Sequence, residues 1–312
     1  MRQPPEPTPE ESESEPVDEP LEELRAVLDG AATAGVRRRD VAVENAAREV
    51  IGSGTEPGAR LGRLAEWAIW LSGAHGTFPP RALERVTMVS VGPPAPPGHP
   101  AYELSIGAGV VARPLVMPAD WASSADVARA GVETIDAIVD AGCDLLICPG
   151  IVDEGSSNTL AALLLHLTAT EVVGDSPQLD DEQWAERVAA VRDRTYPMRG
   201  VDDDPVAVLH ALGSPELTAL TAMLLRAAAR RTPVLLDGAA DCVAALCASR
   251  ISILASWWYA APGSGDAATT RAIEALGIEP VVELGSLLDG GAAALTALPL
   301  LRAAQLLASG AA

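Results

Sequence analysis

Three short segments each place a carboxylate and small residues directly before a stretch with helical periodicity. They are residues 150–160 (GIVDEGSSNTL), 235–241 (LLDGAAD) and 285–291 (GSLLDGG). Each follows a short apolar run that is typical of a buried strand. In parallel sheets, ligands bind beyond the carboxyl ends of the strands, where loops enter helix N-termini. The three segments are therefore candidates for one site.

The first segment carries groups that could hold an anion. Gly155, Ser157, Asn158 and Thr159 offer backbone amides and side-chain donors at a predicted helix start, and Asp153 precedes them. Free amides and the positive end of a helix dipole bind phosphate. The same residue types are also ordinary helix caps, so the pattern alone leaves both interpretations open.

The third segment contains a single charge, Asp289, which is followed by two glycines and a long apolar helix. The carboxylate could cap that helix. It could also act as a general base that removes a proton from a reacting group. Spacing alone does not separate these two functions.

Composition narrows the class of protein. The chain has 312 residues, of which 48% are hydrophobic, and its net charge is −21. Such acidity argues against nucleic acid and anionic membranes as partners, because phosphate contacts need basic patches. The N-terminus lacks the apolar stretch of a secretory signal, and no uncharged apolar run reaches the ~18 residues of a membrane helix. We expect a cytoplasmic protein.

The four cysteines do not indicate a metal site. Cys143 and Cys148 are five residues apart, as are Cys242 and Cys247, and neither spacing is a usual zinc pattern. We expect free, buried thiols, with no metal and no cofactor.

Residues 1–20 are rich in proline, glutamate and serine and are predicted to be disordered. Residues 21–312 are predicted to form one domain in which helices alternate with short apolar strands. The pattern favours an α/β fold with a Rossmann-like parallel sheet flanked by helices, and a small helical subdomain from the two ends of the chain. Residues 93–100 (PPAPPGHP) are predicted to lack regular structure. The predicted strands are residues 85–92, 143–150, 170–174, 232–238 and 279–284.

Several of these motifs, in this order, resemble the nicotinate-nucleotide–dimethylbenzimidazole phosphoribosyltransferase family of cobalamin assembly. The matching segments include VDEGSSNTLAALLLHLT, ARRTPVLLDG, VVELGSLLDGGAAAL and, near the N-terminus, TEPGARLGRLAEW. The resemblance covers residues 53–91 and about 130–308. It implies a homodimer that takes nicotinate mononucleotide and a benzimidazole-type base as small-molecule substrates.

The resemblance also implies roles for individual residues. Asp289 matches the family's proposed general base. The remaining matches are substrate-binding positions: Asp153, Gly155, Ser157, Asn158, Thr159, Gly174, Asp237, Gly238, Ser264 and Asp266. The first five would contact the ribose phosphate, and Gly174 would begin a second phosphate loop.

This sequence departs from the family pattern near the chemistry. Asp289 stands where the family has glutamate, and Ser157, Leu160 and Glu56 replace a glycine, a threonine and a lysine. The family's Ala-Gly-Asp-His-Gly motif reads SVGPPAPPG here, and His99 does not match its histidine. Three functions stay open on these grounds. They are a divergent transferase, an inactive relative that binds a nucleotide or base, and a partner of an active relative.

Overall fold

The structure is a computed structural model. It describes residues 18–33, 35–53, 61–92, 96–115, 123–176, 178–201 and 203–311. The acidic segment that is predicted to be disordered lies outside the described residues up to residue 17, as does Glu56. Helix α1 (Glu19–Ala32) begins two residues before the predicted start of the domain, and the Asp18 side chain caps it.

Five parallel strands form one sheet in the order β2-β1-β3-β4-β5. Their bounds are β1 (Val86–Val91), β2 (Val111–Leu115), β3 (Leu145–Ile147), β4 (Val234–Leu235) and β5 (Tyr259–Ala260). Every residue of β1 is buried, as expected of a central strand with both faces covered. The predicted α/β fold with a parallel sheet is confirmed.

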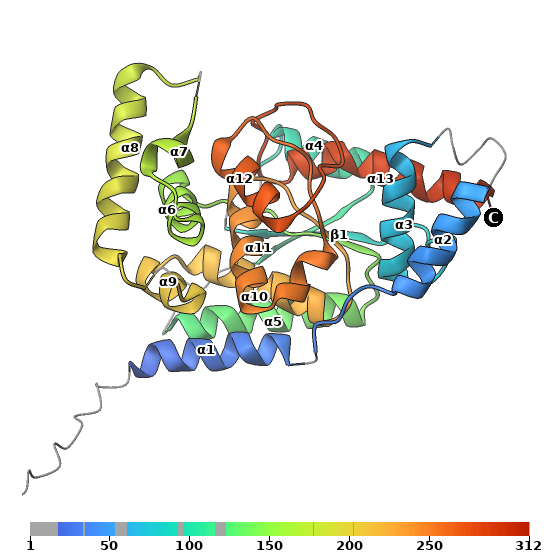
Figure 1. The fold of residues 1–312 in the computed structure, drawn as a ribbon, viewed down its shortest axis with the longest axis horizontal. Coiled ribbons are helices and arrows are strands. Elements are labelled where there is room, and N and C mark those ends of the chain that lie inside the picture. Colours follow the sequence, from blue (N-terminus) through green and yellow to red (C-terminus); the bar gives the residue numbers. More distant parts are fainter. Residues whose placement is uncertain are drawn as a thin grey trace, which may run out of the picture.

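Helices cover both faces of the sheet (Figure 1). One face packs against α1, α5 (Ser124–Asp140), α6 (Glu154–Leu165), α10 (Pro215–Ala229) and α11 (Ala239–Ile251). The other packs against α2 (Val41–Ser53), α3 (Arg63–His75) and α13 (Ala292–Ala311), so the two ends of the chain form a helical layer together. The remaining helices are α4 (Pro100–Gly107), α7 (Ala169–Val173), α8 (Asp181–Thr195), α9 (Pro205–Leu212), α12 (Ala267–Leu276) and the 3₁₀ helices η2 (Tyr196–Met198) and η3 (Ile253–Trp258).

Helix α13 is the one helix among the described residues that is long and apolar enough to cross a membrane, over Ala292–Gly310. Within the protein, 56% of that stretch is buried. Its inner side chains belong to the core cluster that contains α3 and β1. A buried core helix has the same length and composition as a membrane span, and the packing of α13 is that of a core helix.

Two predicted strands are wrong. Residues 170–174 form helix α7 instead, because Thr168 and Glu171 make a reciprocal capping box that starts a helix. Residues 279–284 are irregular and lie outside the sheet, and the Val281 N–H donates to the Ala261 carbonyl at 2.7 Å. The fifth strand is β5, whose two residues are too few to show a periodic pattern.

Helix α4 and strand β2 are also absent from the prediction. Helix α4 begins directly after the proline-rich segment, with His99 as its cap and Pro100 in the first turn. Strand β2 is a sheet edge in which only Leu115 is buried, so it lacks the apolar signature of its neighbours.

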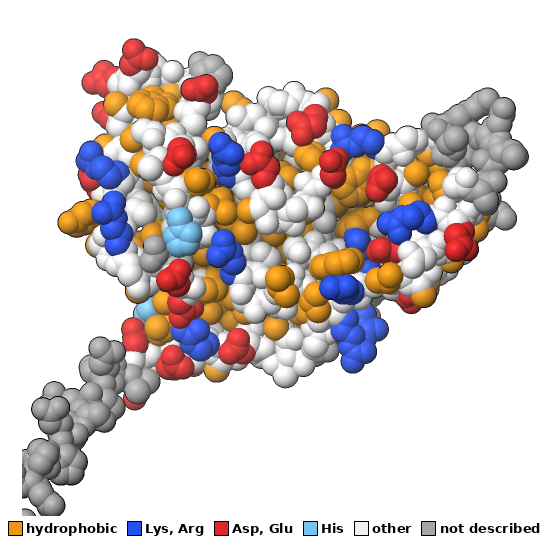
Figure 2. Space-filling model, viewed as in Figure 1, with side chains coloured by type: hydrophobic (Ala, Val, Ile, Leu, Met, Phe, Trp, Pro, Cys, Tyr) orange, Lys and Arg blue, Asp and Glu red, His pale blue; other side chains and the backbone are white. Residues whose placement is uncertain are grey.

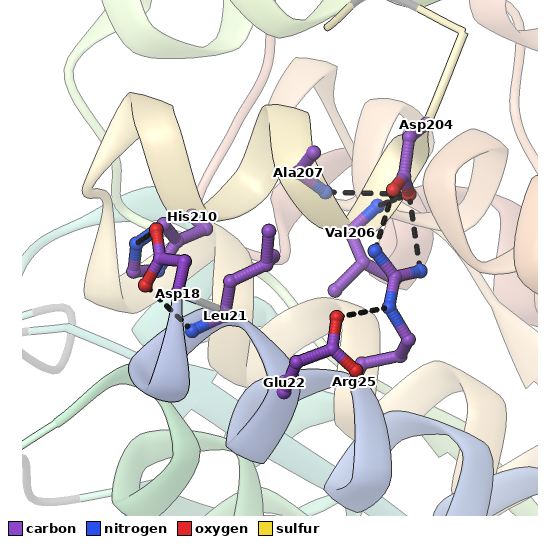
Figure 3. Close-up of polar contacts among 8 residues, drawn as sticks. All are labelled: Asp18, Leu21, Glu22, Arg25, Asp204, Val206, Ala207 and His210. Atoms are coloured by element: carbon purple, nitrogen blue, oxygen red, sulfur yellow. Dashed lines mark hydrogen bonds and ion pairs between the residues drawn. The ribbon is translucent and has the colours of Figure 1, made fainter. Parts of the chain in front are cut away.

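An ion pair joins α1 to α9 (Figure 3). The Arg25 guanidinium contacts both oxygens of Asp204, with the shorter Nη2–Oδ2 distance at 2.5 Å. Asp204 also caps α9 by accepting the N–H groups of Val206 and Ala207. Although burial raises it, these hydrogen bonds hold the pKa of Asp204 below its ordinary value.

We expect Asp204→Ala to lower the free energy of unfolding by about 1–2 kcal/mol, because it removes a helix cap and a partly exposed ion pair. The Asp204 contribution is complete above its unfolded-state pKa of about 3.9 and is lost as pH falls through the lower folded-state pKa. Urea unfolding at pH 7 and pH 3 measures both effects. Asp203→Ala is the control, since this exposed neighbour makes no such contact among the described residues. Equal losses in the two variants would contradict the assignment.

Candidate functional site

Asp237, which follows β4, holds the start of α13. Its Oδ2 accepts the Gly291 N–H at 2.7 Å and its Oδ1 accepts the Ala294 N–H at 2.8 Å. The residue is only 2% exposed. The loop after one strand is thereby tied to a segment more than 50 residues later in the chain.

A second buried carboxylate supports the first. Asp241 accepts the backbone N–H groups of Asp237 and Gly238, which fixes the turn between β4 and α11. Burial, with a smaller contribution from the charge of Asp289, raises the pKa of Asp237 to about 6. Burial, followed by the charge of Asp237, raises the pKa of Asp241 well above its ordinary value.

Gly291 is required where it stands. Its φ is +101°, and a Cβ at this position would lie 2.6 Å from the Met88 sulfur on β1. A larger residue would separate the start of α13 from the sheet. The two glycines after Asp289 therefore let the chain enter the helix in close contact with the core.

Asp289 itself is exposed, and its side chain makes no hydrogen bond with any described residue. Only its carbonyl participates in the turn, by accepting the Ala292 N–H at 3.0 Å. The capping function that the sequence left open for Asp289 belongs to Asp237. The Asp289 carboxylate is thus free to act on a ligand.

His99 lies beside Gly290, the residue that follows Asp289. A Cβ on Gly290 would be 3.4 Å from Cε1 of the imidazole ring, whose Nδ1 accepts the Ala101 N–H at 3.2 Å. His99 is not among the residues that the sequence predicts for the site. The dipeptide His99-Pro100 was the available signal, because proline is common at the first position of a helix.

Hydrophobic side chains border Asp289 on the same loop. Leu284, Leu287 and Leu288 are 57%, 50% and 36% exposed. The tryptophans Trp67 and Trp70 of α3 line a different cavity. Leucines in a loop carry no sequence signal that separates them from core residues.

The predicted anion loop forms the start of α6. Asp153 caps this helix by accepting the Ser156 N–H at 3.0 Å, and it pairs with Arg194 of α8 at 2.8 Å. Although burial raises it, these contacts from Ser156 and Arg194 lower the pKa of Asp153. Thr159 is held internally, because its hydroxyl donates to the Gly155 carbonyl at 2.6 Å.

Ser157 and Asn158 are 2% and 5% exposed, and neither side chain is hydrogen-bonded to another described residue. A pocket of about 540 Å³ opens at this helix start. Arg187 and Arg194 of α8 line the same pocket, where they pair with Glu154 and Asp153 at the helix N-terminus. The arginines were not predicted because their helix resembles any solvent-exposed charged helix.

Gly174, Ser264 and Asp266 meet at the start of α12. Gly174 has φ +59°, and a Cβ there would lie 2.4 Å from the Ala267 methyl group. Asp266 caps α12 through the Thr269 N–H, and the Ser264 hydroxyl donates to the Ser286 carbonyl. This group is thus joined to the loop that carries Asp289.

The cysteines are free, as predicted: Cys148, Cys242 and Cys247 are buried and Cys143 is half-buried. Within the described part of the chain, no three histidine, cysteine or acidic side chains are grouped to bind a metal ion.

The raised pKa of Asp237 gives a pH signature. Because its folded-state value of about 6 lies above the unfolded value of about 3.9, the native state binds the proton more tightly. We expect the stability of the wild type relative to Asp237→Asn to fall as pH rises from about 4 to about 6. Urea unfolding across this range measures the difference. Asp175→Asn, at an exposed carboxylate, should show no such trend, and a flat difference for Asp237→Asn would disprove the assignment.

Comparisons with known proteins agree with this architecture. A family model described as phosphoribosyltransferase matches residues 105–312. The nicotinate-nucleotide–dimethylbenzimidazole phosphoribosyltransferase of Mycobacterium tuberculosis is 34% identical over 327 residues, which cover 87% of this chain and 90% of that protein. The protein of the same name from Mycobacterium ulcerans is 34% identical, covering 85% and 89%.

Solved structures show the same fold. A crystal structure of CobT from Thermus thermophilus has a TM-score of 0.75 with 22% identity, and covers 86% of this chain and 96% of its own. A second structure, of the phosphoribosyltransferase from the same organism, gives a TM-score of 0.74 with the same coverage. By fold, motif order and sequence identity, this chain belongs to the nicotinate-nucleotide–dimethylbenzimidazole phosphoribosyltransferase family.

Proposed function

We propose that this protein transfers the phosphoribosyl group of nicotinate mononucleotide to dimethylbenzimidazole or a related base. Family membership supports the reaction. The observation that carries it is the free Asp289 carboxylate at the carboxyl edge of the sheet, released from capping by Asp237. A cytoplasmic location, expected from the composition, and a homodimer, implied by the resemblance, are part of the same proposal.

The reaction exchanges one bond for another at C1′ of the ribose. A ring nitrogen of the base forms a bond to C1′ as the bond from C1′ to the nicotinate nitrogen breaks. The electron pair of the broken bond neutralises the cationic pyridinium, so nicotinate leaves readily. The proton on the other nitrogen of the base passes to the Asp289 carboxylate, giving α-ribazole phosphate.

The surroundings of Asp289 suit an aromatic acceptor. Leu287 and Leu288 offer exposed apolar surface next to the carboxylate, and the His99 ring lies on the other side of Gly290. An aromatic base seated there would cover the leucines and exclude water from Asp289. Orientation of this kind can contribute more to rate than proton removal alone.

The start of α6 suits the phosphate. Helix N-termini attract anions through their dipole, and Arg194 adds a full charge beside Gly155. Asp153 already occupies the cap position and holds Arg194 in place. We therefore assign Asp153 the positioning of Arg194, and the phosphate contact to Arg194 with the backbone of α6.

The first prediction concerns the general base. Asp289→Ala should lower kcat by about 10²–10⁴-fold, because the base proton then has no acceptor, while the thermal unfolding temperature stays unchanged at this exposed position. Nicotinate release, measured by chromatography with dimethylbenzimidazole as acceptor, gives the rate.

Glu283→Gln is the control, since it removes another exposed carboxylate from the same loop. Undiminished activity in Asp289→Ala would remove Asp289 from the mechanism. Binding of nicotinate mononucleotide by the wild type without release would instead favour the nucleotide-binding alternative.

The second prediction concerns the phosphate. Arg194→Gln should raise KM for nicotinate mononucleotide by roughly 10- to 100-fold, because it removes a charge-assisted hydrogen bond to the phosphate. The KM for dimethylbenzimidazole should change little. Arg192→Gln is the matched control, because Arg192 lies on the same helix and, within the described part of the chain, its side chain pairs only with its neighbour Asp193. Similar KM values in the two variants would place the phosphate elsewhere.

A further inference from the structure

One exposed hydrophobic residue at the carboxyl edge of the sheet has no role in the candidate site described so far. Ile151 follows the end of β3 by a few residues and is 39% exposed. Exposed hydrophobic side chains are common on protein surfaces, and Figure 2 shows several between the charged residues of one face. Exposure alone therefore indicates little, and the surroundings of Ile151 decide its significance.

Ile151 lies at the point where the order of the strands changes direction. The chain passes from β1 to β2 on one side of the sheet, and it then returns to β3 on the other side of β1 before it continues to β4 and β5. Open α/β sheets bind ligands beyond the carboxyl ends of the strands at such a switch point. The Ile151 N–H donates to the Val91 carbonyl at 2.9 Å, and the Val91 N–H donates to the Pro149 carbonyl at 2.9 Å. Ile151 is thus fixed between the carboxyl ends of β1 and β3.

The backbone around Ile151 is tightly packed. Gly92 has φ +98°, and a Cβ on it would lie 2.9 Å from the Ile151 carbonyl oxygen. A Cβ on Gly150 would lie 2.4 Å from Cδ1 of Leu220 on α10 and 3.0 Å from the Ala240 methyl carbon on α11. Glycine at both positions lets the loop after β3 lie directly against its neighbours. The exposed side chain is therefore carried by a rigid support, and its β-branching limits its rotamers further.

The same loop runs between the two ends of the candidate site. Pro149 lies against the start of α13, since a Cβ on Gly291 would be 3.5 Å from the proline Cγ. Asp153 caps α6 and pairs with Arg194. Ile151 is midway along the chain between these two points. In the proposed reaction the general base is near the first point and the phosphate near the second, so the ribose and its ring substituent lie between them.

We propose that the Ile151 side chain contacts the pyridinium ring of nicotinate mononucleotide and orients it for departure from C1′ of the ribose. The inference rests on the proposed transfer reaction. An aliphatic side chain packs on the face of a flat ring without interfering with groups at its edge, and the contact gains strength from the apolar area that both partners remove from water. A fixed contact on the leaving ring restricts its rotation, which is one of the ways in which enzymes lower a barrier.

Calorimetric titration of the full-length protein tests this contact, with nicotinate mononucleotide and ribose 5-phosphate as probes and no acceptor base present. Ile151→Ala should weaken the binding of nicotinate mononucleotide about tenfold, because it removes apolar area from the ring contact. Its affinity for ribose 5-phosphate, which lacks the ring, should equal that of the wild type. Ile151→Val keeps a branched side chain and should bind nicotinate mononucleotide within about twofold of the wild type.

Ile253→Ala is the matched control. Ile253 is 79% exposed and belongs to η3, which precedes β5 and so lies away from the carboxyl ends of the strands. The affinity of this variant for both probes should match that of the wild type. The thermal unfolding temperature of Ile151→Ala should change little, because the side chain is exposed, and this measurement separates a lost contact from a disturbed fold.

Equal affinity of Ile151→Ala and the wild type for nicotinate mononucleotide overturns this inference alone and leaves the proposed function standing. Equal weakening of both probes also overturns it, since the lost contact is then not with the ring. Failure of the wild type to bind nicotinate mononucleotide overturns the proposed function and this inference together.

Discussion

The hydrogen bonds from the start of α13 to Asp237 fix the last helix against the sheet edge at the candidate site. They join the turn after β4 to a helix that follows 50 residues later, and that helix in turn packs on β1 through the contact between Gly291 and Met88. A carboxylate in this position is costly to bury, as the raised pKa of Asp237 shows. The positive end of the α13 dipole and two amide donors offset that cost. The site loop therefore has a fixed start, although most of its residues are exposed.

The same arrangement recurs around the sheet edge. Asp153 and Asp266 each accept an N-terminal amide of the helix that they precede, and Asp241 accepts the amides of the turn before α11. An acidic chain can thus use its carboxylates to fix loops by accepting backbone N–H groups. A helix N-terminus whose amides are occupied in this way is not available to a substrate anion. The start of α6 differs, because Arg194 pairs with Asp153 and balances its charge. Asp289 differs from all of these residues in having no amide to hold.

The sequence predicted the elements correctly where a strand is buried on both faces or a helix is long. Strand β1 and the long helices α5, α10 and α13 all carry clear periodicity. It failed where the element is short or half-exposed. Strand β5 has only two residues, and β2 is an exposed edge. Residues 170–174 and 279–284 have the apolar pattern of strands, but the first segment belongs to helix α7 with its C-cap and the second lies outside the sheet. A local pattern indicates which side chains will be buried, but it does not indicate whether a neighbouring strand is available for backbone hydrogen bonds.

The candidate site shows the same division. The order of motifs along the chain identified Asp237, Gly238 and Asp289, which the structure brings together at one sheet edge, but it could not assign their separate roles. Only the three-dimensional structure distinguishes the two carboxylates, because Asp237 accepts the α13 amides and Asp289 does not. His99 and Leu287 join the site because α4 and the loop before α13 fold against the same edge, and nothing local to either residue marks that contact. Exposed leucine side chains are unfavourable in water. An aromatic ligand that covers them would also remove water from the neighbouring carboxylate. In the proposed mechanism, this apolar surface holds the acceptor base against the Asp289 carboxylate and so compensates for the short aspartate side chain.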